Sequence, residues 1–108
     1  MIAAQVNTST EGEAVHIAVS GEIDLGNAAA LESELRAAVA DQPRAVSVDL
    51  TDLTYLDSTG IRILFVFASL LNPLQVIMKL IVPLDSPIRR LIELSGLESL
   101  AYLRPERC

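Results

Sequence analysis

Alternating apolar and polar positions at the start of the chain predict a pair of strands. The strands are Ile2 to Asn7 and Ala14 to Ser20, and the polar, Gly-containing stretch Thr8 to Glu13 connects them as a hairpin. Apolar side chains of the second strand share one face, which places His16 on the other face. The segment Gly21 to Asp24 breaks the pattern, so we expect the second strand to stop there.

A helix and a third strand follow. Asn27 to Ala40 carries apolar residues at helical spacing, and either Asp24 or Asn27 is expected to cap it. Pro43 ends this helix because a proline disfavours helical geometry in the residue before it. Ala45 to Leu50 alternates again and predicts a half-buried strand. These elements predict a βαβ crossover.

The second half of the chain is more apolar. Ile61 to Leu71 is apolar nearly all round and predicts a helix that is buried on most faces. Leu74 to Val82 predicts a largely buried strand. Ser86 and Pro87 begin a further helix in the favoured N-cap and N1 arrangement, and Gly96 ends it.

This last helix is expected to have a buried stripe and a solvent-facing side. The predicted stripe is Ile88, Leu91 and Ile92. The residues predicted to face solvent are Arg89, Arg90 and Glu93. Leu97 to Leu103 is expected to add one more helical turn, and Arg104 to Cys108 to form a flexible tail.

The order of elements predicts an α/β fold. We expect a mixed sheet of four to five strands, built from the N-terminal hairpin and βαβ crossovers and packed with about four helices. The length of 108 residues fits one domain, residues 1–108, with its core in residues 1–103.

Charge and hydropathy argue against two classes of function, nucleic-acid binding and membrane insertion. A net charge of −6 and eight scattered basic residues argue against a nucleic-acid surface, which would show clustered Lys and Arg. The longest apolar run, Ile63 to Ala68, is far shorter than the ~20 residues that span a bilayer, so we expect no membrane insertion. The expectation is a soluble, cytoplasmic domain that meets a protein partner.

Few residues are suited to metal or redox chemistry. Cys108 is the only cysteine, so no internal disulfide or multi-cysteine metal site can form. His16 is the only histidine, and we expect it to occupy a sheet face or surface rather than to bind a metal. The sequence therefore predicts no metal and no cofactor.

The polar turn Asp57 to Gly60, with the sequence DSTG, separates the strand-like and helical segments around it. A strand that ends in such a turn and starts a helix places the hydroxyls of Ser58 and Thr59 near backbone N–H groups at the helix N-terminus. Anions are favoured at that end of a helix. The turn is therefore a plausible place for a phosphate.

Catalysis by this turn is disfavoured. Serine hydrolysis needs a positioned base, but His16 lies in mid-strand, and no G-x-S-x-G elbow surrounds Ser58. A glycosidase pair drawn from Glu22, Asp24 and Asp57 has few aromatic residues with which to build a sugar cleft. A P-loop is absent. We expect a protein that is not an enzyme.

A response-regulator receiver domain also places a phospho-acceptor after a central strand. That domain would have acidic Mg²⁺ ligands after its first strand and a lysine at the end of its last strand. This chain has Thr8-Ser9 and Val82-Pro83 at those places, so we set the receiver domain aside.

Four segments together carry a more specific signature: Gly21 to Asp24, Val46 to Leu50, Tyr55 to Ile61 and Ser86 to Leu97. Their order and spacing resemble a STAS domain of the bacterial anti-sigma factor antagonist type, over nearly the whole chain. The DSTG turn alone would be a weak signal, but its position between a strand and a buried helix makes the combination specific.

The resemblance implies a regulatory function in transcription. In that family the serine that matches Ser58 is phosphorylated by an anti-sigma factor that is itself a serine kinase, and a serine phosphatase removes the phosphate. The unphosphorylated antagonist binds the anti-sigma factor and frees the sigma factor, and phosphorylation switches this binding off. Thr59 is a less favoured acceptor because it more naturally caps or packs the helix start.

Other residues near the turn would support the phosphosite and bind the partner. By resemblance, Asp24 lies near the phosphosite and contacts the partner. Asp57 either orients the Ser58 hydroxyl or only shapes the turn. Gly60 has no side chain and therefore allows a close approach to the backbone of the turn. Arg62 lies one helical turn after Ser58, where it either pairs with the phosphate or is solvated.

Two further expectations concern partners. Ile61 and Phe65 share the Ser58 side of the helix and are expected to contact the partner, with burial in the core as the alternative. The run Leu70 to Leu74 departs from the Gly-containing, polar connection usual in the family, and such a hydrophobic edge could support a homodimer or a different partner. A second hypothesis is a structural STAS subunit, for instance in a transporter ATPase assembly, in which Ser58 is never phosphorylated.

Overall fold

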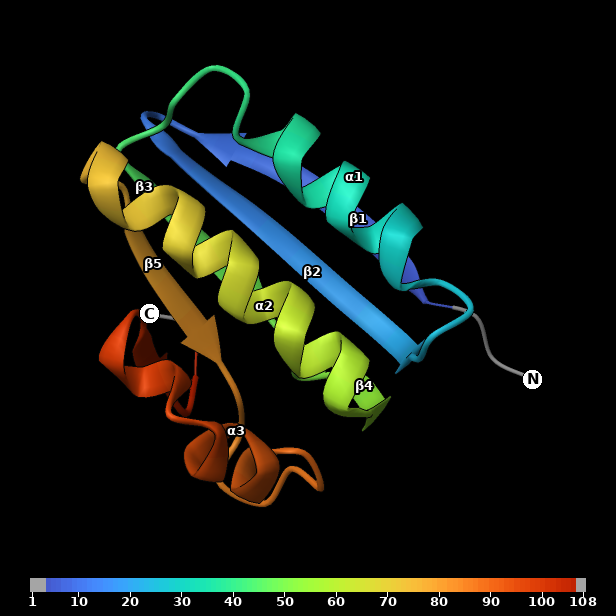
Figure 1. The fold of residues 1–108 in the computed structure, drawn as a ribbon. Coiled ribbons are helices and arrows are strands. Elements are labelled where there is room, and N and C mark those ends of the chain that lie inside the picture. The colour runs from blue at the N-terminus through green and yellow to red at the C-terminus, as the bar shows by residue number, and fades with distance from the viewer. Residues whose placement is uncertain (1–3, 107–108) are drawn as a thin grey trace.

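A computed structural model of the chain describes residues 4–106, which form a mixed sheet with helices on one face (Figure 1). The strand order is β1-β2-β3-β5-β6, and β4 pairs separately with β2. The α/β architecture predicted from the sequence is confirmed. The sheet has six strands rather than four to five, and three α-helices with two short 3-10 turns replace the predicted four helices.

The N-terminal hairpin consists of β1 (Gln5–Glu11) and β2 (Ala14–Ile23), which pair antiparallel. Thr8 to Glu11, predicted to lie in the connection, belong instead to β1, where Thr8 lies opposite Ile17. Threonine is a favourable strand residue, and its repeated occurrence here extends the strand through a stretch that reads as polar loop. The predicted start of this strand at Ile2 lies outside the described residues.

The prediction that β2 stops at Gly21 is wrong. The strand continues to Ile23 through a register shift between Gly21 and Glu22, and Gly21 has a φ of 90° that a side chain would disfavour. The first part of β2 pairs in parallel with β3 (Ala45–Asp49) and the last part pairs in parallel with β4 (Leu53–Leu56). A glycine that was expected to end the strand therefore lies where the strand changes its parallel partner from β3 to β4.

The two long helices follow the predicted pattern. The helix α1 (Ala28–Ala38) connects β2 to β3, and α2 (Ser58–Leu71) follows β4 directly. Figure 1 shows both helices on the same side of the sheet. The separate strand β4 was not predicted, because the sequence analysis placed the DSTG turn directly after the preceding strand.

The C-terminal part begins with the 3-10 turn η1 (Asn72–Leu74), and β5 (Ile77–Ile81) then pairs in parallel with β3. The helix α3 (Arg89–Ser95) has Ile88 as its N-cap, so the prediction that Ser86 and Pro87 begin it is wrong. It ends at Gly96, as predicted. The prediction that Leu91 is buried is wrong, since 39% of it is exposed. The predicted buried positions Ile88 and Ile92 are confirmed.

Two predictions near the end of the chain also need correction. Arg89 does not face solvent freely: its side chain is 15% exposed, and its guanidinium donates to the carbonyl oxygen of Val82. After the 3-10 turn η2 (Leu97–Ser99), the chain forms β6 (Tyr102–Arg104), which pairs in parallel with β5. The region expected to be helical turn and tail therefore supplies an edge strand.

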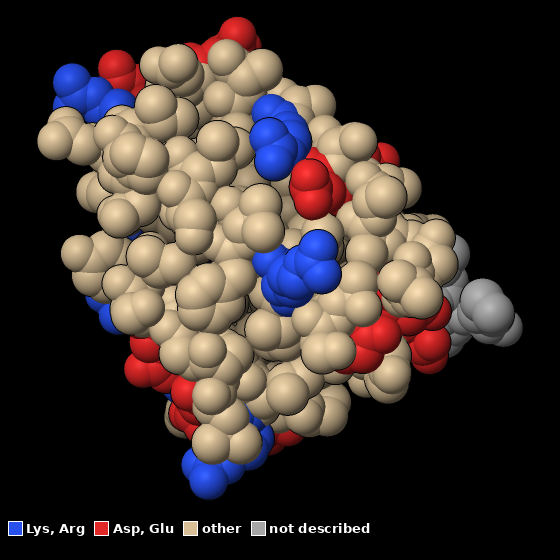
Figure 2. Space-filling view, viewed as in Figure 1, with Lys and Arg blue, Asp and Glu red and all other residues tan. Residues whose placement is uncertain are grey.

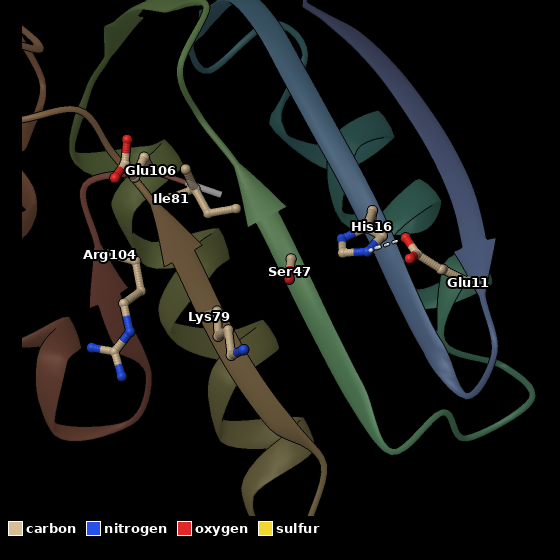
Figure 3. Close-up of a pocket in the computed structure, with 7 residues that line it drawn as sticks. All are labelled: Glu11, His16, Ser47, Lys79, Ile81, Arg104 and Glu106. Carbon is tan, nitrogen blue, oxygen red and sulfur yellow. Dashed lines mark ion pairs between the residues drawn. The ribbon is translucent and has the colours of Figure 1, made fainter. Parts of the chain in front are cut away.

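The core lies between the sheet and its helices. Val15, Ile17 and Val19 of β2 point into it, as the alternation predicted, together with the buried side of α2. The opposite face of the sheet is not covered by any helix of residues 4–106 (Figures 1 and 3). Within the same residues, no helix has the length and apolarity needed to cross a membrane.

Candidate functional site

The DSTG turn lies where β4 ends and α2 begins. Asp57 is the N-cap residue of α2 with an extended backbone, and its carboxylate accepts a hydrogen bond from the N–H of Gly60 at 3.1 Å. Its carbonyl oxygen also accepts the N–H of Ile61 at 3.0 Å. The carboxylate of Asp57 therefore shapes the turn and caps the helix.

Ser58 is the first residue of α2 and is exposed, whereas Thr59 is half-buried. A serine at this position projects its hydroxyl next to the first N–H groups of the helix, which have no partner within the helix. The positive end of the helix dipole also favours an anion there. Of the two hydroxyls, the geometry therefore makes Ser58 the more accessible acceptor.

The loop that carries Asp24 leaves the sheet beside this turn. Ile23 pairs with Leu56 in the β2–β4 register, so Asp24 and Asp57 follow directly from neighbouring strand positions. Strands in a sheet lie about 4.8 Å apart, so the two carboxylates start from adjacent points on the same edge of the sheet. The register thus brings together two site residues that are far apart in the sequence.

Hydrogen bonds hold this loop in shape. The Asp24 carboxylate accepts the N–H of Gly26 at 2.8 Å. The Asn27 side chain accepts the N–H of Asp24 at 3.0 Å and donates to the carbonyl oxygen of Glu22 at 2.8 Å. Asn27 occupies the N-cap position of α1, but its side chain makes no capping bond to that helix. Neither of the two predicted caps therefore caps α1, and both side chains instead fix the loop.

Gly60 brings α2 close to the sheet. A Cβ atom added at Gly60 would lie 2.3 Å from Cδ1 of Leu56 and 2.9 Å from Cγ2 of Ile23, both of which are buried. Real Cβ atoms do not approach other heavy atoms so closely. The close approach expected from the sequence is present, and it fixes the start of α2 against β2 and β4.

The remaining predicted residues lie on the outer side of α2. Arg62 is exposed, follows Ser58 by one helical turn and has no ion-pair partner within residues 4–106. Ile61 and Phe65 are half-buried and pack against the core, so only part of each side chain is available to a partner.

Charge is distributed unevenly around the site. In Figure 2, acidic side chains gather near the end of β2 and its loop to α1, whereas the surface over α2 is mostly uncharged. Leu25, in the loop beside Asp24, is 79% exposed, and Leu84, in the loop after β5, is 74% exposed. Neither leucine was predicted to lie near the site, although an apolar residue between Asp24 and Gly26 is a signal that could have identified the first.

Replacing Asp57 tests the cap. We expect Asp57→Ala to lower the free energy of unfolding by about 0.5–2 kcal/mol, because the N–H of Gly60 loses its acceptor. Asp57→Asn keeps an oxygen acceptor and should lose less. Urea unfolding measures both effects, with Asp85→Ala, at an exposed carboxylate in the loop after β5, as the matched control. If Asp57→Ala and Asp85→Ala had equal stability, the cap bond would contribute nothing.

Comparison with known proteins identifies the family. Residues 5–106 match the model of the STAS domain. The anti-sigma-F factor antagonist RsfB of Mycobacterium tuberculosis is 38% identical over 82 residues, which are 76% of this chain and 66% of that protein. The anti-sigma-B factor antagonist of Staphylococcus aureus is 30% identical over 100 residues, which are 91% of this chain and 90% of that protein.

Solved structures of anti-sigma factor antagonists also resemble this chain. A crystal structure of an anti-sigma factor antagonist from Mycobacterium paratuberculosis superposes with a TM-score of 0.87 at 31% identity, covering 96% of this chain and 87% of that one. The anti-sigma factor antagonist SpoIIAA in its unphosphorylated form has a TM-score of 0.72 at 19% identity, over 97% of this chain and 90% of that one, and shows the same fold. The chain therefore belongs to the STAS domain family, where its relatives are named anti-sigma factor antagonists.

Proposed function

We propose that this chain is an anti-sigma factor antagonist that is switched by phosphorylation of Ser58. The observation that carries the proposal is the exposed Ser58 hydroxyl at the first position of α2, in a turn held by Asp57. The names of the relatives support the regulatory class. A structure of SpoIIAA in a phosphorylated form, which has the same fold at 21% identity, shows that a protein of this fold can carry the modification.

In the proposed cycle the unphosphorylated chain binds an anti-sigma factor serine kinase and thereby frees a sigma factor. The kinase transfers phosphate to Ser58, the complex dissociates, and a serine phosphatase restores the hydroxyl. The chain itself supplies the acceptor and the docking surface but no catalysis. Asp24, Thr59, Ile61, Arg62 and Phe65 would form the surroundings of Ser58 that the partner contacts.

The physical chemistry of the turn favours such a switch. A phosphate on Ser58 adds about 1.5 to 2 negative charges, and the N-terminus of α2 offsets part of their cost within the domain. The fold therefore need not change. A partner packed over Ser58 would have to bury the new charge beside the Asp57 carboxylate, so the cost falls on the complex.

Intact mass spectrometry tests the proposal directly. The purified protein is incubated with ATP and each candidate anti-sigma kinase, alongside Ser58→Ala and Thr59→Ala. We expect one phosphate on the wild type and on Thr59→Ala, and none on Ser58→Ala. Ser69→Ala, at an exposed serine near the other end of α2, is the matched control and should accept phosphate normally.

The opposite result would be no phosphate from any candidate kinase. If the protein then co-purified stably with an unrelated complex, such as a transporter ATPase assembly, the structural-subunit hypothesis would replace the switch.

A further inference from the structure

The uncovered face of the sheet contains a trough that is lined by none of the residues proposed above to contact the anti-sigma partner. Its volume is about 350 Å³, and Figure 3 shows the residues around it. The lining residues are Glu11, His16, Ser47, Lys79, Ile81, Arg104 and Glu106. Because α1 and α2 cover the opposite face, this trough is separated from Ser58 by the sheet itself.

Three polar side chains form a row across the floor of the trough. The parallel registers place His16 of β2 beside Ser47 of β3, and Ser47 beside Lys79 of β5. Neighbouring strands lie about 4.8 Å apart, so His16 and Lys79 start about 10 Å apart with the short Ser47 side chain between them. That spacing leaves room above Ser47 for one small group that reaches both long side chains.

His16 presents an unused acceptor to this row. Its Nε2 lies 3.4 Å from the Glu11 carboxylate, and its Nδ1 is buried without a hydrogen-bond partner. In the neutral tautomer that keeps its proton on Nε2, facing Glu11, Nδ1 is a lone-pair acceptor. Buried polar atoms in folded proteins are nearly always paired, so the free Nδ1 points to a donor that the described chain does not supply.

Lys79 presents a free cation at the other end. It is half-buried, and no carboxylate within residues 4–106 forms an ion pair with it. In Figure 3 Lys79 lies next to Ser47 on the same face of the sheet, whereas Arg104 and Glu106 lie beyond Lys79, toward β6. The guanidinium of Arg104 lies 5.5 Å from the centre of the Tyr102 ring. Lys79 is therefore the cation available in the centre of the trough.

We propose that this row is a binding site for inorganic phosphate, in the form of hydrogen phosphate. Two phosphate oxygens accept from the Lys79 ammonium and the Ser47 hydroxyl, and the P–OH group donates to Nδ1 of His16. Nδ1 is buried in the structure, so binding requires the imidazole to rotate about its Cβ–Cγ bond, a torsion that is broad in histidine. The row thus offers a cation and a neutral donor for the phosphate oxygens, and an acceptor for the P–OH group.

Sulfate provides a sharp comparison because it has the same shape and charge as hydrogen phosphate but no O–H group. The unpaired Nδ1 would face a sulfate oxygen, and two acceptors in contact leave both unsatisfied. We expect phosphate to bind at least tenfold more tightly than sulfate at pH 7.5 and constant ionic strength.

The site can be observed selectively, since His16 and Lys79 are the only histidine and the only lysine in the chain. The proposed experiment is an NMR titration of the intact, unphosphorylated protein with inorganic phosphate, sulfate and chloride. The signals followed are the single imidazole, the single lysine ammonium and the backbone amides of β2, β3 and β5. Phosphate should shift the signals of the row in a saturable way, and chloride should not.

Two variants make the test decisive. Lys79→Met should raise the dissociation constant for phosphate at least tenfold, and Ser47→Ala should raise it at least threefold. Arg90→Met, at an exposed arginine on α3 outside the trough, should leave it unchanged. Equal shifts with phosphate and sulfate, or an unchanged dissociation constant in Lys79→Met, would overturn the proposal. None of these outcomes depends on whether Ser58 is a phosphorylation site.

Discussion

Phosphorylation of Ser58 is expected to weaken binding to the anti-sigma partner about a thousandfold, which corresponds to about 4 kcal/mol. Ser58 is exposed at the start of α2, so a partner that covers it must remove water from the phosphate. Asp57 adds a like charge next to it, and Asp24 leaves the sheet at the neighbouring position. Burying a charge without a partner costs several kcal/mol, and this cost exceeds the modest stabilisation from a helix N-terminus.

Isothermal titration calorimetry with the cognate anti-sigma factor measures this effect on the unmodified and the stoichiometrically phosphorylated protein. Ser69→Glu is the matched control, because it adds a negative charge to the same helix about 16 Å from Ser58. We expect that control to change affinity little. A similar loss of affinity in Ser69→Glu would show that overall charge repulsion, rather than the buried phosphate, separates the partners.

Gly60→Ala is expected to lower the free energy of unfolding by about 1 to 3 kcal/mol, the usual cost of an overpacked core. Alanine in a helix is normally about 1 kcal/mol more favourable than glycine, so the sign of this effect is informative. The added methyl would meet Leu56 at 2.3 Å and Ile23 at 2.9 Å, and neither buried side chain can move into solvent. We therefore expect the clash to outweigh the helix propensity.

Urea unfolding of the wild type, Gly60→Ala and Gly26→Ala measures this effect. Gly26 is an exposed loop position where a Cβ would approach only the Asp24 carboxylate, at 3.2 Å, and that side chain can give way. A stabilised Gly60→Ala would mean that α2 does not lie as close to β2 and β4 as the structure shows.

The elements that the sequence predicted well have strong local signals. The apolar spacing of α1, the continuous apolar run of α2 and the alternation in β3 each determine their element without help from distant residues. By contrast, β4 has only four residues, two of them exposed, and it exists because the end of β2 supplies a partner. The three-residue β6 depends on β5 in the same way. Short strands defined by tertiary pairing carry little signal of their own.

In the candidate site too, some residue roles follow from the local sequence and others follow only from the pairing of distant strands. Asp57, Ser58 and Gly60 are adjacent in sequence, so their roles at the helix start follow from local rules for caps and turns. The position of Asp24 beside them follows only from the β2–β4 register. The row of His16, Ser47 and Lys79 was not predicted at all, because three separate strands have to be aligned before these residues meet.

The change of pairing partner at Gly21 also has a consequence for how the molecule opens. Upstream of Gly21 the strand is held by β1 and β3, whereas downstream it is held by the short ladder to β4. Proteins open in cooperative units whose free energies differ, and a short ladder at the end of a sheet opens more easily than a central one. The end that carries Asp24 and Ser58 is therefore expected to open at a lower free energy than the central strands.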